Sequence, residues 1–195
     1  MMSLKEIYNL GMEASKTVRP VDFIDNVNYV DIWDTENCYN YLWWAGLVKE
    51  MKFKQIVELG GAMGVWALMV VSTAPKETDI WTITLPEGGL EYSFVKKQWD
   101  NLHTVVGDDL KWESWPEDFD IEKTDCIYFD SLHTYEQLTK ELEMYGPKLK
   151  SGTLAVFDDI FQNEGMKRAW EELKWEKFDQ TGNLHYTGYG LSRVP

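Results

Sequence analysis

The sequence predicts an α/β fold with a doubly wound, mostly parallel seven-stranded sheet, a helical N-terminal cap and an antiparallel C-terminal strand. Two observations support this prediction. From Gln55 onward, short apolar runs alternate with helical patterns, which is typical of repeated βα units. The length of 195 residues suits one full-sized core. We therefore expect a cap over residues 1–50 and one α/β domain over residues 51–195, with a ligand cleft at the carboxyl ends of the parallel strands.

Two helices are expected before the first strand. Ser3 and Glu6 have the spacing of a capping box, and the helix that they begin should end before Pro20. A second helix should start near Asp34 or Thr35. Its neighbourhood is rich in aromatic residues, which could form a stacking wall over a substrate or, as we favour, pack the helices onto the sheet or onto a second subunit of a homodimer. These aromatic residues are Tyr29, Trp33, Tyr39, Tyr41, Trp43 and Trp44.

The remaining elements follow from apolar periodicity and from Gly and Pro breaks. Parallel strands are expected at 55–59, 79–84, 103–106, 125–129 and 153–157. Helices are expected over 63–73, 90–99 and 135–149, and around Met166, Ala169, Trp170 and Leu173. An antiparallel pair formed by 175–180 and 186–194, turning at Gly182-Asn183, should close the sheet.

Charge and composition exclude several classes of function. A net charge of −14 would repel a nucleic-acid backbone, so we expect no nucleic-acid partner. No run approaches the roughly 18 apolar residues of a membrane span, and the first twenty residues mix charges with apolar positions, which favours a cytoplasmic protein. Of the two cysteines, Cys126 lies in an apolar run and is expected to be a buried, reduced thiol.

A glycine-rich turn follows the first expected strand, in the order Glu58, Leu59, Gly60, Gly61, Ala62, Met63, Gly64. Glycine lets the backbone approach a ligand closely, and the start of the next helix offers unpaired N–H groups. Any tight strand-to-helix turn also favours glycine. The motif alone therefore indicates, but does not establish, a ligand-binding turn.

Together with three downstream segments, this turn resembles the class I S-adenosylmethionine-dependent methyltransferases, whose first motif is acid-x-Gly-x-Gly-x-Gly. Ala62 stands at the middle glycine. The downstream segments are Val106-Gly107-Asp108-Asp109, Tyr128-Phe129-Asp130-Ser131-Leu132-His133-Thr134-Tyr135-Glu136 and Gly152-Thr153-Leu154-Ala155-Val156-Phe157-Asp158-Asp159. They are similar to the branch with an Ile-Asp-Gly-x-His-x-Tyr segment, which includes metal-dependent O-methyltransferases of the macrolide-sugar and catechol kinds. The resemblance implies a Rossmann-like methyltransferase fold and covers about residues 55 to 172.

The resemblance also implies a set of cofactor-binding residues. The methionine part of S-adenosylmethionine would lie against the glycine turn, and the adenine near the turn after the third strand. Members of the family usually hold the ribose with an acid after the second strand, where this chain has Thr84 and, further on, Glu87. The expected cofactor residues are therefore Glu58, Gly60, Gly61, Ala62, Gly64, Thr84, Asp108, Asp109 and Asp130.

Three acids follow the fourth and fifth expected strands: Asp130, Asp158 and Asp159. Adjacent parallel strands lie about 4.8 Å apart, so carboxylates at their ends should converge. Crowded carboxylates favour a hard cation such as Mg²⁺, Ca²⁺ or Mn²⁺, and the resemblance implies the same three residues as metal ligands. The alternative is that these acids simply cap the helices that follow them.

His133 lies three residues after Asp130. An imidazole beside a bound cation could accept a proton from a substrate hydroxyl, so we expect His133 and Asp130 to be catalytic. A lone histidine could equally pin the loop.

Three hypotheses about function follow. The first is metal-assisted O-methylation of a small hydroxylated molecule by S-adenosylmethionine. The second, suggested by the missing acid after the second strand, is a non-catalytic binding or assembly module. The third, a nucleotide-sugar or nicotinamide enzyme, is disfavoured because the Gly-x-Gly-x-x-Gly spacing is absent.

Overall fold

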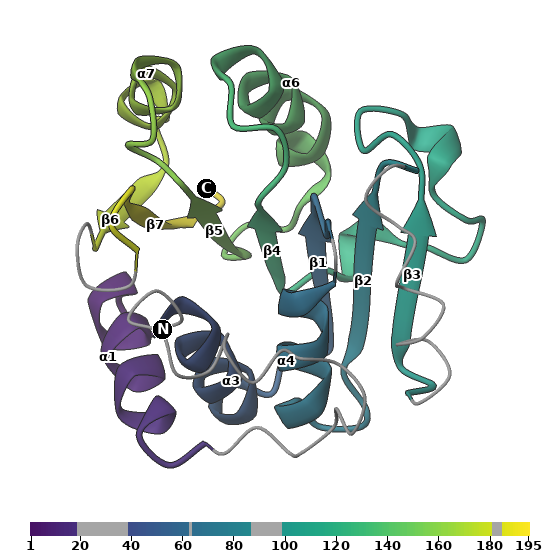
Figure 1. The fold of residues 1–195 in the computed structure, drawn as a ribbon, viewed down its shortest axis with the longest axis vertical. Helices are drawn as coiled ribbons and strands as arrows, with labels where there is room; N and C mark the ends of the chain where they lie inside the picture. The colour runs from purple at the N-terminus through teal and green to yellow at the C-terminus, as the bar shows by residue number, and fades with distance from the viewer. Residues whose placement is uncertain (19–38, 63, 87–98, 181–184) are drawn as a thin grey trace.

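The computed structural model describes residues 1–18, 39–62, 64–86, 99–180 and 185–195, and these form a three-layered α/β structure (Figure 1). The central sheet has seven strands in the order β3-β2-β1-β4-β5-β7-β6. Pairing is parallel from β3 through β5, whereas β7 pairs antiparallel with both β5 and β6. The strands are β1 (Gln55–Leu59), β2 (Asp79–Thr84), β3 (Leu102–Val106), β4 (Cys126–Phe129), β5 (Leu154–Asp158), β6 (Glu176–Asp179) and β7 (Tyr189–Arg193). The predicted fold class, including the antiparallel C-terminal strand, is confirmed.

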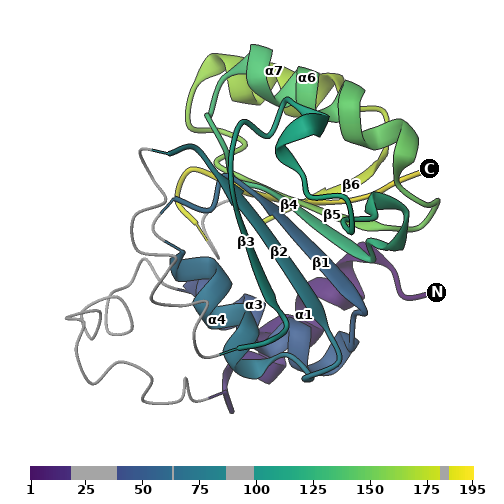
Figure 2. The ribbon, with the colours of Figure 1, turned by 90° about the vertical axis from the view of Figure 1, so that its right-hand side faces the viewer.

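Helices cover both faces of the sheet, as Figure 2 shows edge-on. On one face lie α1 (Leu4–Ser15), α3 (Tyr39–Met51) and α4 (Val65–Thr73), and on the other lie α6 (Tyr135–Tyr145) and α7 (Glu164–Glu172). Each face has its own buried apolar cluster. The β-strand alternation assigns residues to them, because Ile56 and Tyr128 face α3 and α4 while Val57 and Phe129 face the opposite layer.

Several element boundaries differ from those expected. Helix α4 begins two residues later than predicted because its N-cap, Gly64, has a φ of 79°, which is not helical. Helix α6 ends at Tyr145 and continues as a 3-10 helix over Gly146–Lys148, since Pro147 has no N–H to donate. The helix expected over 90–99, the turn at Gly182-Asn183 and the start of the second helix lie largely or wholly outside the described residues.

The two tryptophans of α3 pack in the core. Trp43 and Trp44 are fully buried, and the Trp44 ring makes edge contacts with Trp66 and Tyr128. The Tyr29 and Trp33 positions lie outside the described residues. Cys126 is a buried free thiol, as expected. Within the described part of the chain, no helix has both the length and the apolar content that crossing a membrane requires.

The strand registers determine where the site can form. Leu59 of β1 pairs with Phe129 of β4, and Phe129 pairs with Phe157 of β5. The residues that follow these three positions therefore emerge at the same edge of the sheet. This edge receives the glycine turn, Asp130 and Asp158.

Candidate active site

The glycine turn after β1 packs directly against the end of β4. The N–H groups of Gly60 and Gly61 both donate to the carbonyl of Ile83, at 3.0 Å. Gly60 has a φ of +94°, and a Cβ at this position would lie 2.1 Å from the carbonyl oxygen of Asp130. Glycine is therefore required at position 60. At the middle-glycine position, Ala62 adopts a φ of 39°, a conformation that glycine accepts more easily.

A cavity of about 540 Å³ opens beside this turn, at the carboxyl ends of β1 to β4. Such a volume is within the roughly 300–1,000 Å³ range of small-molecule sites. Its lining includes six of the expected cofactor residues: Gly60, Ala62, Thr84, Asp108, Asp109 and Asp130. The other lining residues are Ile83, Leu85, Gly107, Leu110, Ser131, Leu132 and Gln137. Glu58, Gly61 and Gly64 are not among them.

The side chain of Glu58 packs inside the protein and does not line the cavity. It is buried, and its carboxyl group accepts a hydrogen bond from the Thr82 hydroxyl on the neighbouring strand. Burial raises the pKa of Glu58 well above its usual range. The acid of the first motif therefore supports the strand pair, while the turn that follows it faces the cavity.

The second strand contributes apolar and hydroxyl groups to the cavity. Thr84 ends β2 and Leu85 follows it, and both line the cavity. Pro86 comes next, and Glu87 lies outside the described residues. Leu85 and Pro86 are the described residues directly after β2, and neither is an acid that could hold a ribose.

The two acids after β3 are held in different ways. Asp108 pairs with Lys111 at 2.9 Å and accepts a hydrogen bond from the Leu110 N–H at 3.0 Å, and these contacts lower its pKa. Asp109 accepts a hydrogen bond from Gln137 Nε2 at 3.0 Å. Its backbone carbonyl also accepts one from the Tyr145 hydroxyl. Both acids are thus fixed at the wall of the cavity.

One buried acid near the cavity was not predicted from the sequence. Glu141 of α6 is buried, accepts a hydrogen bond from the Ser131 hydroxyl and accepts another from Gln137 Nε2 at 2.8 Å. Burial and the nearby Asp109 raise its pKa well above the usual range. Glu141 therefore fixes two side chains that line the cavity. The signal available in the sequence was its spacing of four residues from Gln137, which places both side chains on the same face of the helix.

The acids after β4 and β5 converge, but not as a single group of three. Asp130 and Asp158 offer ligand atoms within 4.8 Å of one another together with His133, and Asp158 and Asp159 do so together with His185. Asp158 belongs to both groups. Among the described residues, the predicted triad of Asp130, Asp158 and Asp159 is therefore divided between two overlapping groups, each completed by a histidine.

The alternative role of these acids as helix caps is wrong. Helix α6 is capped by Thr134, whose hydroxyl accepts a hydrogen bond from the Gln137 N–H at 3.2 Å. Helix α7 is capped by Asn163, whose side-chain oxygen accepts one from the Met166 N–H at 3.0 Å. Asp130, Asp158 and Asp159 therefore cap neither helix.

His133 bridges two of the acids. Its Nε2 lies 3.3 Å from Asp130 Oδ1, and its Nδ1 lies 2.9 Å from Asp159 Oδ2. Burial opposes the charged form, but hydrogen bonds to the two carboxylates raise the pKa of His133 to about 10. The two carboxylates thus favour the imidazolium form of the ring between Asp130 and Asp159.

His185 is the functional candidate that sequence reasoning missed. It precedes β7, and its Nδ1 lies 2.9 Å from Asp159 Oδ1 and 3.6 Å from Asp158 Oδ1. Thr187 donates its hydroxyl hydrogen to Asp159 Oδ1. Burial raises the pKa of Asp159, but the hydrogen bonds from His133, His185 and Thr187 outweigh it and hold that pKa below its usual value.

The donor set fits a divalent cation. Asp158 Oδ1 is buried and has no hydrogen-bond partner among the described residues. Burial, together with Asp130 and Asp159, raises the pKa of Asp158 well above its usual range. A buried unpartnered carboxylate oxygen is costly without a partner, and carboxylate oxygens are the ligands that such cations prefer.

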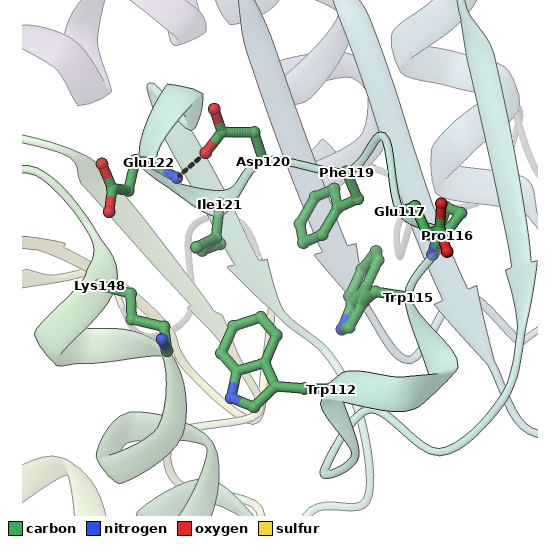
Figure 3. A pocket seen from close by; sticks show the side chains of 9 residues that line it. All are labelled: Trp112, Trp115, Pro116, Glu117, Phe119, Asp120, Ile121, Glu122 and Lys148. Carbon is green, nitrogen blue, oxygen red and sulfur yellow. Dashed lines mark hydrogen bonds between the residues drawn. The ribbon is translucent and has the colours of Figure 1, made fainter.

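A second hollow, of about 330 Å³, lies away from these residues, between the β3–β4 connection and the turn after α6 (Figure 3). Trp112, Trp115, Phe119 and Lys148 contribute to its lining. The Trp115 indole N–H donates to the Tyr145 hydroxyl at 2.9 Å. Tyr145 thereby links this hollow to the Asp109 carbonyl at the larger cavity. No residue predicted for the site lines the hollow.

Comparison with solved structures places this architecture in a known class. An O-methyltransferase from Bacillus cereus in complex with SAH superposes with a TM-score of 0.65 at 14% identity, over 100% of this chain and 93% of that one. An SAH-bound methyltransferase from Podospora anserina gives 0.64 at 14% identity, over 100% and 97%. Fibrillarin from Aeropyrum pernix with natively bound S-adenosyl-L-methionine gives 0.59 at 18% identity, over 80% and 76%. The fold is that of the class I S-adenosylmethionine-dependent methyltransferases.

The sequence itself gives the family. A family model described as a methyltransferase domain matches residues 57–160, from β1 to just beyond β5. No curated protein sequence matches the chain. The chain therefore belongs to this methyltransferase-domain family, as its sequence resemblance indicated.

Proposed function

We propose that this protein transfers the methyl group of S-adenosylmethionine to an oxygen of a small hydroxylated molecule, with the assistance of a divalent cation. One observation carries the proposal. Asp130 lines the cavity beside the glycine turn and also belongs to the acid cluster. A cofactor in the cavity and a substrate oxygen at the cluster would therefore meet at Asp130.

The cavity supplies what the cofactor needs, apart from the ribose acid. Gly60 and Ala62 give the methionine part close access to the backbone, and Asp108 and Asp109 lie where the adenine is expected. Leu85 and Leu110 offer apolar contact to a flat ring. Thr84 is the polar side chain nearest in sequence to the missing acid, so we assign it the ribose.

The acid cluster would hold the cation. Asp130 and Asp158 are the first ligands, and Asp158 Oδ1 is free to bind. Asp159 accepts hydrogen bonds from Thr187 and Gln162 and contacts both histidines, so it would bind only by exchanging one of these partners. When bound, a divalent cation would polarise a substrate oxygen and favour its deprotonation.

His133 is the proposed proton acceptor once a cation binds. The cation would engage Asp130 and oppose a positive charge on the ring, which would lower the pKa of His133 and leave the imidazole neutral. Its side chain is about one-fifth exposed and lies next to Asp130 at the cavity. Asp159 orients the ring through Nδ1 and would stabilise the imidazolium that forms when Nε2 takes the proton of the substrate hydroxyl. Positioning of the acceptor oxygen in line with the methyl group would supply much of the acceleration.

Calorimetry tests the proposal. Titration with S-adenosylhomocysteine, the demethylated product, should release heat with a 1:1 stoichiometry, and Asp130→Asn should weaken binding. Incubation with S-adenosylmethionine and small polyhydroxylated acceptors should yield a product heavier by one methylene, in lower yield after chelation of divalent ions. Failure of wild-type protein to bind either nucleoside at millimolar concentration would reject the enzyme and favour a binding or assembly module.

A further inference from the structure

The C-terminal segment adds an imidazole to the acid cluster. We propose that His185 is a ligand in the cation site, beside Asp158 and Asp159, and that the site therefore prefers a first-row transition-metal ion such as Co²⁺ or Zn²⁺ over Mg²⁺. The inference rests on the cation site of the proposed function and specifies which ion that site takes.

The distances around His185 are within about 0.1 Å of those expected for ligands that share an ion. Two donors bound to one ion at about 2.1 Å, with an angle of roughly 90–110°, lie about 3.0–3.5 Å apart. The Nδ1 atom of His185 lies 2.9 Å from Asp159 Oδ1 and 3.6 Å from Asp158 Oδ1. The second distance is too long for a hydrogen bond.

A second observation points to a ligand at this place. Asp158 Oδ1, the atom 3.6 Å from His185, is buried without a hydrogen-bond partner among the described residues. The Asp158 side chain is about nine-tenths buried. His185 Nδ1 lies 2.6 Å from Thr187 Oγ1 and 2.9 Å from Asp159 Oδ1, so its hydrogen bonds go to these groups and leave the Asp158 oxygen without a partner. An ion bound by Nδ1 and Asp158 Oδ1 would satisfy that oxygen and would replace the hydrogen bonds of Nδ1.

The backbone holds His185 in place. The Phe161 N–H donates to the Thr187 carbonyl at 2.7 Å, and the Ile160 N–H donates to that of Gly188 at 3.3 Å. Gly188 has a φ of +94°, and a Cβ there would lie 2.5 Å from the Phe161 ring. The segment before β7 is therefore fixed next to the end of β5, where Asp158 and Asp159 lie.

The identity of the donors determines the preference among ions. Carboxylate oxygens alone suit Mg²⁺, Ca²⁺ and Mn²⁺, whereas imidazole nitrogen favours Zn²⁺, Ni²⁺ and related ions. Two histidines contact the acids here, and Asp159 accepts from both. The imidazole of His185 therefore shifts the preference of the site towards Zn²⁺, Ni²⁺ and related ions.

The test compares ion affinities in the full-length chain after removal of divalent ions. Co²⁺ and Mg²⁺ are titrated separately into the wild type, His185→Ala, His185→Gln and Asp158→Asn. His103→Ala is the matched control, because His103 is also paired with an aspartate, Asp79, at 3.2 Å, but lies on β3. Circular dichroism melting checks that each variant folds, and the glutamine variant serves if the alanine variant does not.

We expect the Co²⁺/Mg²⁺ affinity ratio to fall by about tenfold or more in both His185 variants, the scale on which ligand-shell changes act. The ratio should be unchanged in His103→Ala, and Asp158→Asn should lose both ions. An unchanged ratio in the folded His185 variants, or no ion binding by the wild type, would overturn the inference. S-adenosylhomocysteine is titrated into the same samples. Its failure to bind rejects the proposed function while leaving the ion result standing.

Discussion

Gly60→Ala should damage both the stability of the protein and its cofactor site. The new Cβ would lie 2.1 Å from the carbonyl oxygen of Asp130 and 2.4 Å from the Cα of Ser131. Both are backbone atoms, so neither can move aside by a change of rotamer. Relief requires the β1 turn to separate from the end of β4, which displaces the residue shared by the cavity and the acid cluster.

The expected magnitude has two parts. A non-glycine residue at a φ of +94° costs roughly 1–3 kcal/mol of folding free energy. Forcing a methyl group into a packed site costs about 1–3 kcal/mol more. The sum of roughly 2–6 kcal/mol corresponds to a fall in Tm of at least about 4 °C for a chain of this size.

Thermal melting and calorimetry with S-adenosylhomocysteine measure the two effects. Ala62→Gly is the control, because Ala62 lines the same cavity and its φ of 39° suits glycine. We expect the free energy of unfolding of this variant to lie within about 1 kcal/mol of the wild-type value. Glycine relieves the backbone strain at this φ, and this gain offsets the greater conformational entropy of the unfolded chain. A Gly60→Ala variant that melts and binds like the wild type would refute the packing argument.

Three further substitutions give separate outcomes. Because the pKa of Glu58 is raised in the folded state, the wild type has the full stability contributed by the neutral carboxyl group below about pH 4.5 and loses it as the pH rises. Glutamine does not titrate. The Tm of Glu58→Gln minus that of the wild type should therefore grow between about pH 5 and pH 8. A constant difference across pH would contradict this. Asn163→Ala removes the cap of α7 and should cost about 1 kcal/mol in urea unfolding; no change would show that the cap is dispensable. Tyr145→Phe leaves the Trp115 N–H and the Asp109 carbonyl without their partner. The substitution should lower the free energy of unfolding by about 1–3 kcal/mol and weaken S-adenosylhomocysteine binding. An affinity equal to that of the wild type would show that Tyr145 does not support the cavity.

The sheet could be predicted because its signals are local. Each buried parallel strand is a short apolar run between turn residues, and the expected ranges agree with the observed strands to within one residue at each end for β1 to β5. The alternation of side chains along β1 also predicts the orientation of Glu58. Glu58 has the same parity as Ile56, so it had to face the buried helical layer rather than the cleft.

The caps show how competing local signals can be resolved. Thr134 and Gln137 have the capping-box spacing, and Asn163 precedes α7. These residues begin the helices, so Asp130, Asp158 and Asp159 were not needed as caps. The sequence therefore contained the evidence against the capping alternative.

His185 could not be placed from sequence because its position depends on a long-range pairing. It reaches the acids only because β7 pairs antiparallel with β5, bringing Tyr189 opposite Asp158. Nothing in the residues around position 185 encodes that register. The small number of histidines, three in the whole chain, was the available signal, since two of them contact the acid cluster.

The position of β7 within the sheet has a consequence for synthesis on the ribosome. Strand β6 emerges before β7 but reaches the sheet only through it, in the order β5-β7-β6. Until residues 189–193 are available, β6 has no strand to join and β5 remains an open edge. The same late segment brings His185 and Thr187 to the acids. A nascent chain should therefore complete its sheet and its imidazole-lined cluster in one step, once residues 185–193 have left the ribosome.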